Sequence, residues 1–384
     1  MAATHRIRLE ARALTRAGLR VSILLARASE RTPAIVNTRS EGEWHGVPFR
    51  YSPGTSVRSE RFLTRRWQDL RGIIGAVATI FSGRRSGELD CVYLWMGFDR
   101  TVFRLLRGIC ALLRMPVVSE LCEPPREIWA GTPLSAGAGR RHSLLSHIDG
   151  FVAISSELET WVRTRKGGSK PRVVKVPILV DTDDVEPSFE PASRHDLCYT
   201  SAAGYLDEIE FLLDVVEGAR EHYPDVRVRY VGWEVGELSR PDLQRRIRAH
   251  VAAGSAIVEG LVPVERLVDS YRECAALLLP IKDEPRFNAA FPTKLGEYLA
   301  SGRPVVANGI GEVGRLLSDG ENAFLAEPGS VRSFTDALLR ALEDPERALA
   351  VGRRGRLLAE QMLDYRRHGE PLREFFEAVC AEHC

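Results

Sequence analysis

The sequence predicts an α/β protein made of two doubly wound domains, and three observations support this fold class. Short apolar runs alternate with helical segments along the chain, which is typical of parallel strands covered by helices on both faces. The alternation restarts after a linker at residues 181–194 that is rich in Asp, Glu, Pro and Ser. The length of 384 residues suits two domains of ordinary size. We therefore expect one domain over residues 1–180 and a second over 181–384.

The first half is expected to begin with a helix over residues 4–18, which ends at Gly18, and a buried strand over Val21–Ala26. Residues 61–82 form an amphipathic basic helix, in which Arg61, Arg65, Arg66 and Arg71 are set against Phe62, Leu70 and Ile74. A further helix is expected over Thr101–Leu113. The other strands of this half are expected at Cys91–Trp95, Pro116–Glu120, Gly150–Ile154 and Val173–Val176.

The second half repeats the pattern, with a helix between each pair of strands. A turn at Asp319–Asn322 precedes a short strand over Phe324–Ala326, and long helices follow near residues 330–343 and 345–363. The preceding strands are expected at Leu197–Thr200, Val226–Val231, Ala256–Glu259, Ala276–Pro280 and Pro304–Ala307. Ligands of such folds bind outside the carboxyl ends of the strands.

The composition excludes several classes of protein. Mean hydropathy is -0.15, and no apolar run approaches the ~20 residues that span a bilayer. The arginine-rich start does not read as a signal peptide. The seven cysteines are scattered without CxxC spacing, which argues for a reducing compartment and against a zinc site. We therefore expect a cytoplasmic protein without a bound metal.

The net charge of +1 conceals an uneven distribution. Residues 1–180 hold 29 Lys and Arg against 15 Asp and Glu, whereas the remainder holds 24 against 37. The basic half predicts contact with anionic lipid at the inner face of a membrane, or with a phosphorylated acceptor. Attraction between the two halves is the open alternative. Nucleic acid is not expected, because aromatic residues are not interleaved with the basic ones.

The segment from Phe291 to Ala307 is the most informative part of the chain. Pro292 suits the first turn of a helix, and Gly302 followed by Pro304 predicts its end. A helix start offers N–H groups and a positive dipole end to a phosphate. Lys294 adds a charge there, and Glu297 lies on the same face because it is three residues further on. An ordinary surface helix with a Lys294–Glu297 ion pair is the alternative.

With these residues in view, the chain resembles the retaining glycosyltransferases of the GT-B fold, family GT4. The resemblance covers most of the chain and is densest in the second half. It rests on the order and spacing of several segments. These are Phe291–Ala307, Asp319–Phe324, Glu327–Gly329, Ala153–Leu158, Val176–Asp181, Leu277–Pro280 and Asp364–Tyr365.

The resemblance implies an acceptor-binding domain over residues 1–180 and a nucleotide-sugar-binding domain over 181–384, with the last helix, about 365–384, returning to the first domain. It implies that Glu297 binds the ribose of the donor and that Lys294 serves catalysis and donor binding. Glu123, or the nearby Glu120, is expected to meet the transferring sugar or the acceptor. The other implied donor-binding residues are Thr293, Leu295, Leu261, Val262, Asn288, Ala289, Ala290, Phe291 and Arg286.

The chain departs from the family pattern in three places. Ala289 occupies the position of the first Glu of the E-x7-E motif, and backbone amides at 288–290 are the expected substitute. The loop at residues 201–208 lacks the usual Arg and Lys, which leaves Lys294 as the main cation and Arg286 as a helper. The chain also begins with the family's first helix, without the usual first strand and its glycine-rich loop, so we expect either a misplaced start codon or an N-terminal domain that lacks this strand.

We therefore expect metal-independent transfer of a sugar from a nucleoside diphosphate sugar to a hydroxyl acceptor, with retention at the anomeric carbon. The acceptor would be a polysaccharide precursor, a lipid-linked saccharide or a natural product. The main alternative is a degenerate homologue that binds a nucleotide sugar or a partner without catalysis. A nucleotide-sugar epimerase is a further alternative. A nicotinamide dehydrogenase is disfavoured because no G-x-G-x-x-G follows a first strand.

Overall fold

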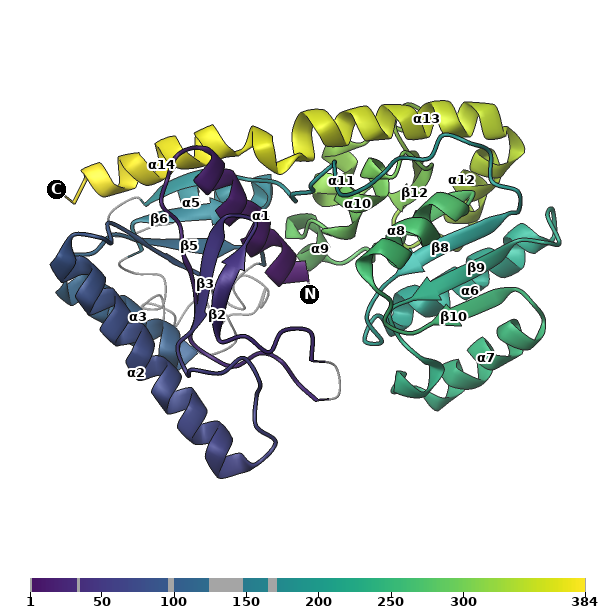
Figure 1. The fold of residues 1–384 in the computed structure, drawn as a ribbon. Coiled ribbons are helices and arrows are strands. Elements are labelled where there is room, and N and C mark those ends of the chain that lie inside the picture. Colours follow the sequence, from purple (N-terminus) through teal and green to yellow (C-terminus); the bar gives the residue numbers. More distant parts are fainter. Residues whose placement is uncertain (1, 33–34, 96–99, 124–147, 165–170, 384) are drawn as a thin grey trace, which may run out of the picture. The chain divides into compact units, whose positions relative to one another are not determined.

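The computed structural model describes residues 2–32, 35–95, 100–123, 148–164 and 171–383 (Figure 1). The chain divides into two compact units. One comprises Ala3–Pro177 together with Tyr365–Cys384, and the other comprises Ile178–Asp364. Parallel strands with helices between them form the core of each unit, which confirms the predicted α/β class.

The described part of the first unit contains two sheets. A four-stranded parallel sheet has the order β4-β5-β6-β7, and its register pairs Val118 of β5 with Gly150 of β6. A three-stranded sheet has the order β1-β3-β2, in which β2 is antiparallel to β3. The strands are β1 Ile23–Leu25, β2 Glu41–Trp44, β3 Val47–Tyr51, β4 Val92–Leu94, β5 Val117–Leu121, β6 Gly150–Ala153 and β7 Arg172–Lys175.

Five helices of the described chain belong to the first unit, and the last of them comes from the far end of the sequence. They are α1 Ala2–Arg16, α2 Phe62–Ser86, α3 Arg100–Leu112, α5 Ser156–Thr164 and α14 Gly369–Ala381. Helix α14 packs on the parallel sheet, where a Cβ at Gly150 would lie only 2.7 Å from the Phe375 ring. The sheet therefore needs glycine at this position to receive the helix.

Helix α2 is oriented differently from an ordinary amphipathic helix. Its buried residues are Asp69, Gly72, Ala76 and Ile80, and a Cβ at Gly72 would lie 2.1 Å from the carbonyl oxygen of Ala26. Leu70 and Ile74, in contrast, are 48% and 58% exposed. The large apolar side chains of this helix thus share the solvent side with its arginines, because small residues are needed where it packs closely.

The second unit is a six-stranded parallel sheet with the order β10-β9-β8-β11-β12-β13. Apolar residues make up most of these strands because helices bury both faces. They are β8 Asp196–Thr200, β9 Arg227–Val231, β10 Ala256–Glu259, β11 Ala276–Leu279, β12 Val305–Asn308 and β13 Phe324–Ala326. The chain winds one way from β8 through β10 and then crosses back to β11, so the topological switch point lies between β8 and β11.

The helices of the second unit follow the expected alternation. They are α6 Leu206–Arg220, α7 Pro241–Ala252, α8 Val264–Glu273, α9 Pro285–Ala289, α10 Lys294–Ala300, α11 Gly311–Leu316, α12 Val331–Glu343 and α13 Pro345–Leu358. A π-helical turn over Ala359–Leu363 extends α13. Short 3₁₀ turns lie at Val235–Glu237 in this unit and at Tyr365–Arg367 in the first.

The turn after α10 fits the predicted stop signal. Gly302 has φ +72°, and a Cβ there would lie 2.5 Å from the Phe189 ring. Helix α13 also crosses this turn closely, since a Cβ at Gly352 would lie 2.2 Å from the carbonyl oxygen of Gly302. Two glycines thus fix the carboxyl end of α10 and, with it, the direction of its amino end.

Candidate functional site

The carboxyl ends of β11 and β12, together with the start of α6, border a cavity of about 330 Å³ near the switch point of the second unit. Ligands of doubly wound sheets bind at this kind of position. The buried Asn308 braces one side, because its Oδ1 accepts the Ile281 N–H at 2.9 Å and its Nδ2 donates to the Glu327 carbonyl at 2.8 Å. The lining consists of Asp207, Glu208, Phe211, Pro280, Ile281, Lys282, Asp283, Glu284, Asn308 and Gly329.

Lys294, the first residue of α10, reaches the end of β8. Its Nζ donates to the Thr200 carbonyl at 2.6 Å and lies 4.3 Å from the centre of the Tyr199 ring. Burial lowers the pKa of Lys294 from 10.5 to about 8, although Glu208 and Glu297 act in the opposite direction. An anion beside Lys294 would favour its charged form and raise this pKa again.

Glu297 lies one turn further along α10 and is half-buried. The hydroxyl of Tyr271, from α8, donates to its Oε2 at 3.1 Å. The Tyr271 ring also makes an edge contact with Tyr298, at 5.1 Å between centres, and the Tyr298 hydroxyl accepts the Thr200 N–H at 2.9 Å. Residues from three elements therefore hold the carboxylate beside Lys294, as the spacing on one helix predicted.

The amino end of α10 differs from the expectation. The helix begins at Lys294, not at Pro292, because Pro292 and Thr293 form a tight turn before it. The Leu295 N–H donates to the Pro292 carbonyl at 3.1 Å, and the Gly296 N–H donates to the Thr293 carbonyl at 3.2 Å. Leu295 is also fully buried, so its placement offers a diphosphate neither its side chain nor its amide.

The segment before α10 carries most of the remaining predicted donor residues. Asn288 is exposed and Ala290 half-buried, while Ala289 and Phe291 are buried. The side chain of Arg286 lies outside the described part of the structure. Gly311, with φ +56°, packs against this segment, since a Cβ there would lie 2.7 Å from the Asn288 carbonyl oxygen. The backbone of 287–288 is therefore held by the start of α11.

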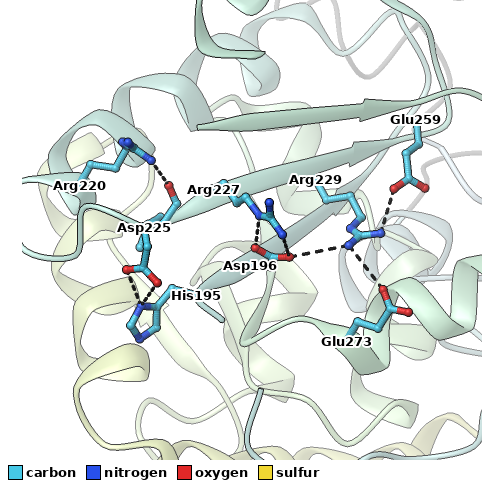
Figure 2. A network of polar contacts seen from close by, with 9 residues as sticks. His195, Asp196, Arg220, Asp225, Arg227, Arg229, Glu259 and Glu273 are labelled. Carbon is cyan, nitrogen blue, oxygen red and sulfur yellow. Dashed lines mark hydrogen bonds and ion pairs between the residues drawn. The ribbon is translucent and has the colours of Figure 1, made fainter. Parts of the chain in front are cut away.

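The loop between β10 and α8 presents apolar side chains to solvent. Leu261 is 64% exposed and Val262 is half-buried. Arg229 of β9 fastens both ends of this loop-and-helix segment: it pairs with Glu259 at 2.9 Å and with Glu273 at 3.4 Å (Figure 2). The clamp fixes the loop in one position, as a surface for a flat ligand requires.

In the first unit, the two candidate carboxylates lie in different surroundings. Glu123 is exposed and follows β5 by two residues. Glu120 is buried, accepts from Arg6 Nε at 2.9 Å and contacts the Tyr93 hydroxyl. Burial, with a contribution from Glu120, raises the pKa of the adjacent Glu10 to about 8 despite Arg6. Glu120 is thus engaged by its own chain, and Glu123 remains the candidate for an acceptor.

Three residues of the site gave no signal in the sequence. Tyr271 and Arg229 are single polar residues in an ordinary helix and an ordinary strand. Lys282 follows β11, lines the cavity and forms an ion pair with Asp207 of α6. Its position after a strand end could have suggested a role, because the loop at residues 201–208 offers no cation of its own.

Among the described residues, no three or more His, Cys, Asp or Glu side chains come together in a way that would hold a metal ion. No helix in the described parts of the chain combines the length and the apolar character needed to cross a membrane.

The family model described as "Glycosyl transferases group 1" matches residues 194–344, which carry the cavity, Lys294 and Glu297. The second unit is thus similar to the group 1 glycosyltransferases over the part of the chain that carries its sheet. Among curated relatives, the D-inositol 3-phosphate glycosyltransferase of Corynebacterium aurimucosum is 31% identical over 34% of the chain and 31% of that protein. The phosphatidyl-myo-inositol mannosyltransferase of Mycobacterium leprae is 27% identical over 53% of the chain and 54% of that protein. The chain thus spans between about a third and about a half of these relatives.

Solved structures resemble this chain over most of its length. Sucrose-phosphate synthase from Thermosynechococcus elongatus aligns with a TM-score of 0.70 and 16% identity, covering 100% of this chain and 94% of that one. Anabaena HepE in complex with UDP and glucose aligns with a TM-score of 0.64 and 17% identity, covering 87% of each chain. At identities this low, the TM-scores establish the fold alone, which is the GT-B fold of two Rossmann-like domains.

Proposed function

We propose that this protein transfers a sugar from a nucleoside diphosphate sugar to a hydroxyl acceptor, with retention at the anomeric carbon. The observation that carries the proposal is the placement of Lys294 and Glu297 one turn apart on α10, with Lys294 reaching the end of β8, in the domain that matches the family. A cation and a carboxylate on one helix face suit a diphosphate joined to a ribose. HepE, a structural neighbour, was solved with UDP and glucose and with UDP-glucose.

In this proposal the donor lies along the carboxyl edge of the second sheet. Lys294, with Thr293 beside it, contacts the diphosphate, and Glu297 accepts hydrogen bonds from the ribose hydroxyls. The nucleobase rests on the exposed loop at Leu261 and Val262, which Arg229 holds through Glu259. Tyr271 orients the Glu297 carboxylate through its 3.1 Å hydrogen bond.

The donor sugar occupies the cavity at the switch point. Its lining includes the carboxylates of Asp207, Glu208, Asp283 and Glu284 together with Lys282. Carboxylates accept hydrogen bonds from sugar hydroxyls. They supply acceptors that Ala289 lacks, so the missing first Glu of the E-x7-E motif does not leave the sugar without partners.

The chemical step requires stabilisation of the leaving diphosphate as it gains negative charge. Lys294 is half-buried at that position, and a fixed cation in a partly desolvated site stabilises a developing anion more than water does. The charge is supplied by the protein, so the proposal includes no metal. Glu123, exposed after β5, is the proposed contact for the acceptor in the first unit.

We further propose that the acceptor carries phosphate or lipid, and that the basic first domain contacts an anionic membrane from the cytoplasmic side. The excess of Lys and Arg over Asp and Glu in residues 1–180 supports this. The inositol phosphate and phosphatidyl-myo-inositol in the names of two relatives are acceptors of the same kinds.

A thermal-shift screen against UDP, GDP, ADP and TDP sugars tests the donor proposal. A donor bound at 100 times its Kd stabilises the folded state by about 2.7 kcal/mol. The donor that raises Tm is then incubated with the protein, and release of the free nucleoside diphosphate is followed with and without acceptor. Stabilisation by none of the four would contradict the proposal.

The degenerate homologue remains the second candidate, because Ala289 and the loop at residues 201–208 depart from the family pattern. It predicts a different outcome in the same experiment. The donor would raise Tm, but no nucleoside diphosphate would be released with any acceptor. Turnover by the wild type that is lost in Lys294→Met would exclude it.

A further inference from the structure

Helix α2 carries a continuous apolar stripe on its solvent side. Leu63 is 80% exposed, Trp67 63%, Leu70 48%, Ile74 58% and Phe81 50%. Their spacings of four, three, four and seven residues place them on one face of the helix. This face is opposite to the buried one, which is formed by Asp69, Gly72, Ala76 and Ile80. A contiguous row of large exposed apolar residues marks an interaction surface.

The same helix is strongly basic. Arg66 and Arg84 lie along one border of the stripe and Arg71 along the other, and Arg85 continues it at the carboxyl end. Arg66 also lies over the Phe62 ring, at 5.1 Å. The one acidic residue of the helix, Asp69, is on the buried face and pairs with Arg27 and Arg58, at 3.7 and 3.6 Å. The solvent side thus presents positive charge around an apolar centre.

We infer that α2 is a membrane-docking helix that lies in the plane of an anionic bilayer and inserts this stripe between the lipid headgroups. The inference rests on the proposed membrane contact of the first domain and names the element that makes it. The 25 residues of the helix, about 37 Å long, have the composition of interfacial helices, with Trp, Phe and Leu flanked by arginine. Trp67, near the middle of the first half of the helix, suits the headgroup region.

Charge decides between this occupant and a second copy of the chain. Two α2 helices packed stripe to stripe would bring their arginines together without an acidic partner on the solvent side, which is unfavourable. An anionic bilayer supplies the opposite charge over an extended surface, at about 1 kcal/mol for each Arg near it. Apolar and electrostatic contributions then act in the same direction.

Co-sedimentation with vesicles tests the inference. The vesicles contain phosphatidylcholine alone or with about 30% phosphatidylglycerol, which gives an anionic surface. The stripe variant is Leu63→Ser/Trp67→Ser/Ile74→Ser and the charge variant is Arg66→Glu/Arg84→Glu/Arg85→Glu. The matched control, Leu112→Ser/Val251→Ser/Leu357→Ser, removes three exposed apolar side chains elsewhere. Thermal unfolding and the nucleotide-sugar shift show that each variant is folded.

The wild type should sediment with the phosphatidylglycerol vesicles, less so as salt is added. Both α2 variants should bind at least about tenfold more weakly, while the control binds like the wild type. Equal binding of wild type and stripe variant would overturn the inference and leave the membrane contact to another surface. No sedimentation of the wild type would overturn both, without touching the donor proposal. A wild-type dimer that the stripe variant dissociates would identify the stripe as a self-interface and would also overturn it.

Discussion

Both units place a charged cluster at the carboxyl end of a parallel sheet, and the two clusters are partnered differently. In the first unit, Arg6 is 2% exposed and is bound by Glu120, Glu10 and the carbonyls of Val176 and Pro177. In the second, Lys294 and Glu297 are half-buried, and Glu208, whose charge acts on Lys294, lines a cavity. A cluster saturated by its own chain stabilises the fold, whereas one held in place beside open space can serve a ligand.

The largest effect on stability is expected at the cluster around Arg6 in the first unit. Arg6→Met leaves the buried carboxyl groups of Glu10 and Glu120 without a cation and two carbonyls without a donor. Breaking a buried pair in this way costs about 3–5 kcal/mol, so urea unfolding should show a loss of that size. The control, Arg16→Met, makes the same change at an exposed position of the same helix and should cost under about 1 kcal/mol. Equal losses in the two variants would remove the distinction between the clusters.

Glu297→Ala should weaken nucleotide-sugar binding and leave the free energy of unfolding nearly unchanged. Hydrogen bonds to charged groups contribute about 1.5–3 kcal/mol, so nucleotide-sugar affinity should fall by roughly 10- to 100-fold and transfer at least as much. The free energy of unfolding should change by less than about 1 kcal/mol. Isothermal titration and urea unfolding measure the two quantities, with the exposed Glu343→Ala as control. Unchanged affinity would remove Glu297 from the proposed site.

Glu10, which belongs to the cluster around Arg6, should make the stability of the protein depend on pH. Its pKa is about 8 in the folded protein against an ordinary 4.5, so the folded state binds this proton more tightly than the unfolded chain. Its contribution to stability is therefore greatest below about pH 4.5 and declines as pH rises to about 8. Glu10→Gln stays neutral throughout, so it should be more stable than the wild type by about 1–3 kcal/mol at pH 7.

The difference between Glu10→Gln and the wild type should shrink as pH falls toward 4.5, and thermal unfolding across this range measures it. Glu43→Gln changes an exposed carboxylate and should leave the profile unaltered. A Gln variant less stable than the wild type at pH 7 would mean that Glu10 is ionised in the folded protein and pairs with Arg6.

The sequence predicted local relations better than distant ones. Lys294 and Glu297 share a face because they are three residues apart on one helix, and Gly302 ends that helix as its φ requires. The start of α10 was predicted two residues too early, because a proline tight turn and a helical first turn have the same sequence signal. Fold class followed from the alternation of strands and helices, which is likewise a local pattern.

The partners of the site came from elements far apart in the chain. Thr200 lies 94 residues from Lys294, and Tyr271 lies 26 residues from Glu297. Neither pairing has a periodicity that could reveal it. The orientation of α2 was equally hidden, because apolar residues at helical spacing predict a core face. Only the close packing at Gly72 shows that the opposite face is buried.

The smallest expected effect is a proton linked to donor binding. The pKa of Lys294 is about 8 in the free protein, and an adjacent diphosphate should raise it by favouring the ammonium form. Binding above pH 8 therefore takes up a proton, and the Kd for a nucleotide sugar should rise roughly tenfold between pH 7 and pH 9. Titration calorimetry in two buffers of different ionisation enthalpy measures the uptake directly.

Lys294→Arg separates this linkage from a general loss of affinity at high pH. Arginine stays charged at every pH used, so the variant should bind with a flat pH profile and no proton uptake, even where its fit weakens binding at pH 7. A wild type with the same flat profile would show that the ammonium does not meet the diphosphate. Lys294 would then belong with Arg6, as a cation that joins a helix to the end of a strand.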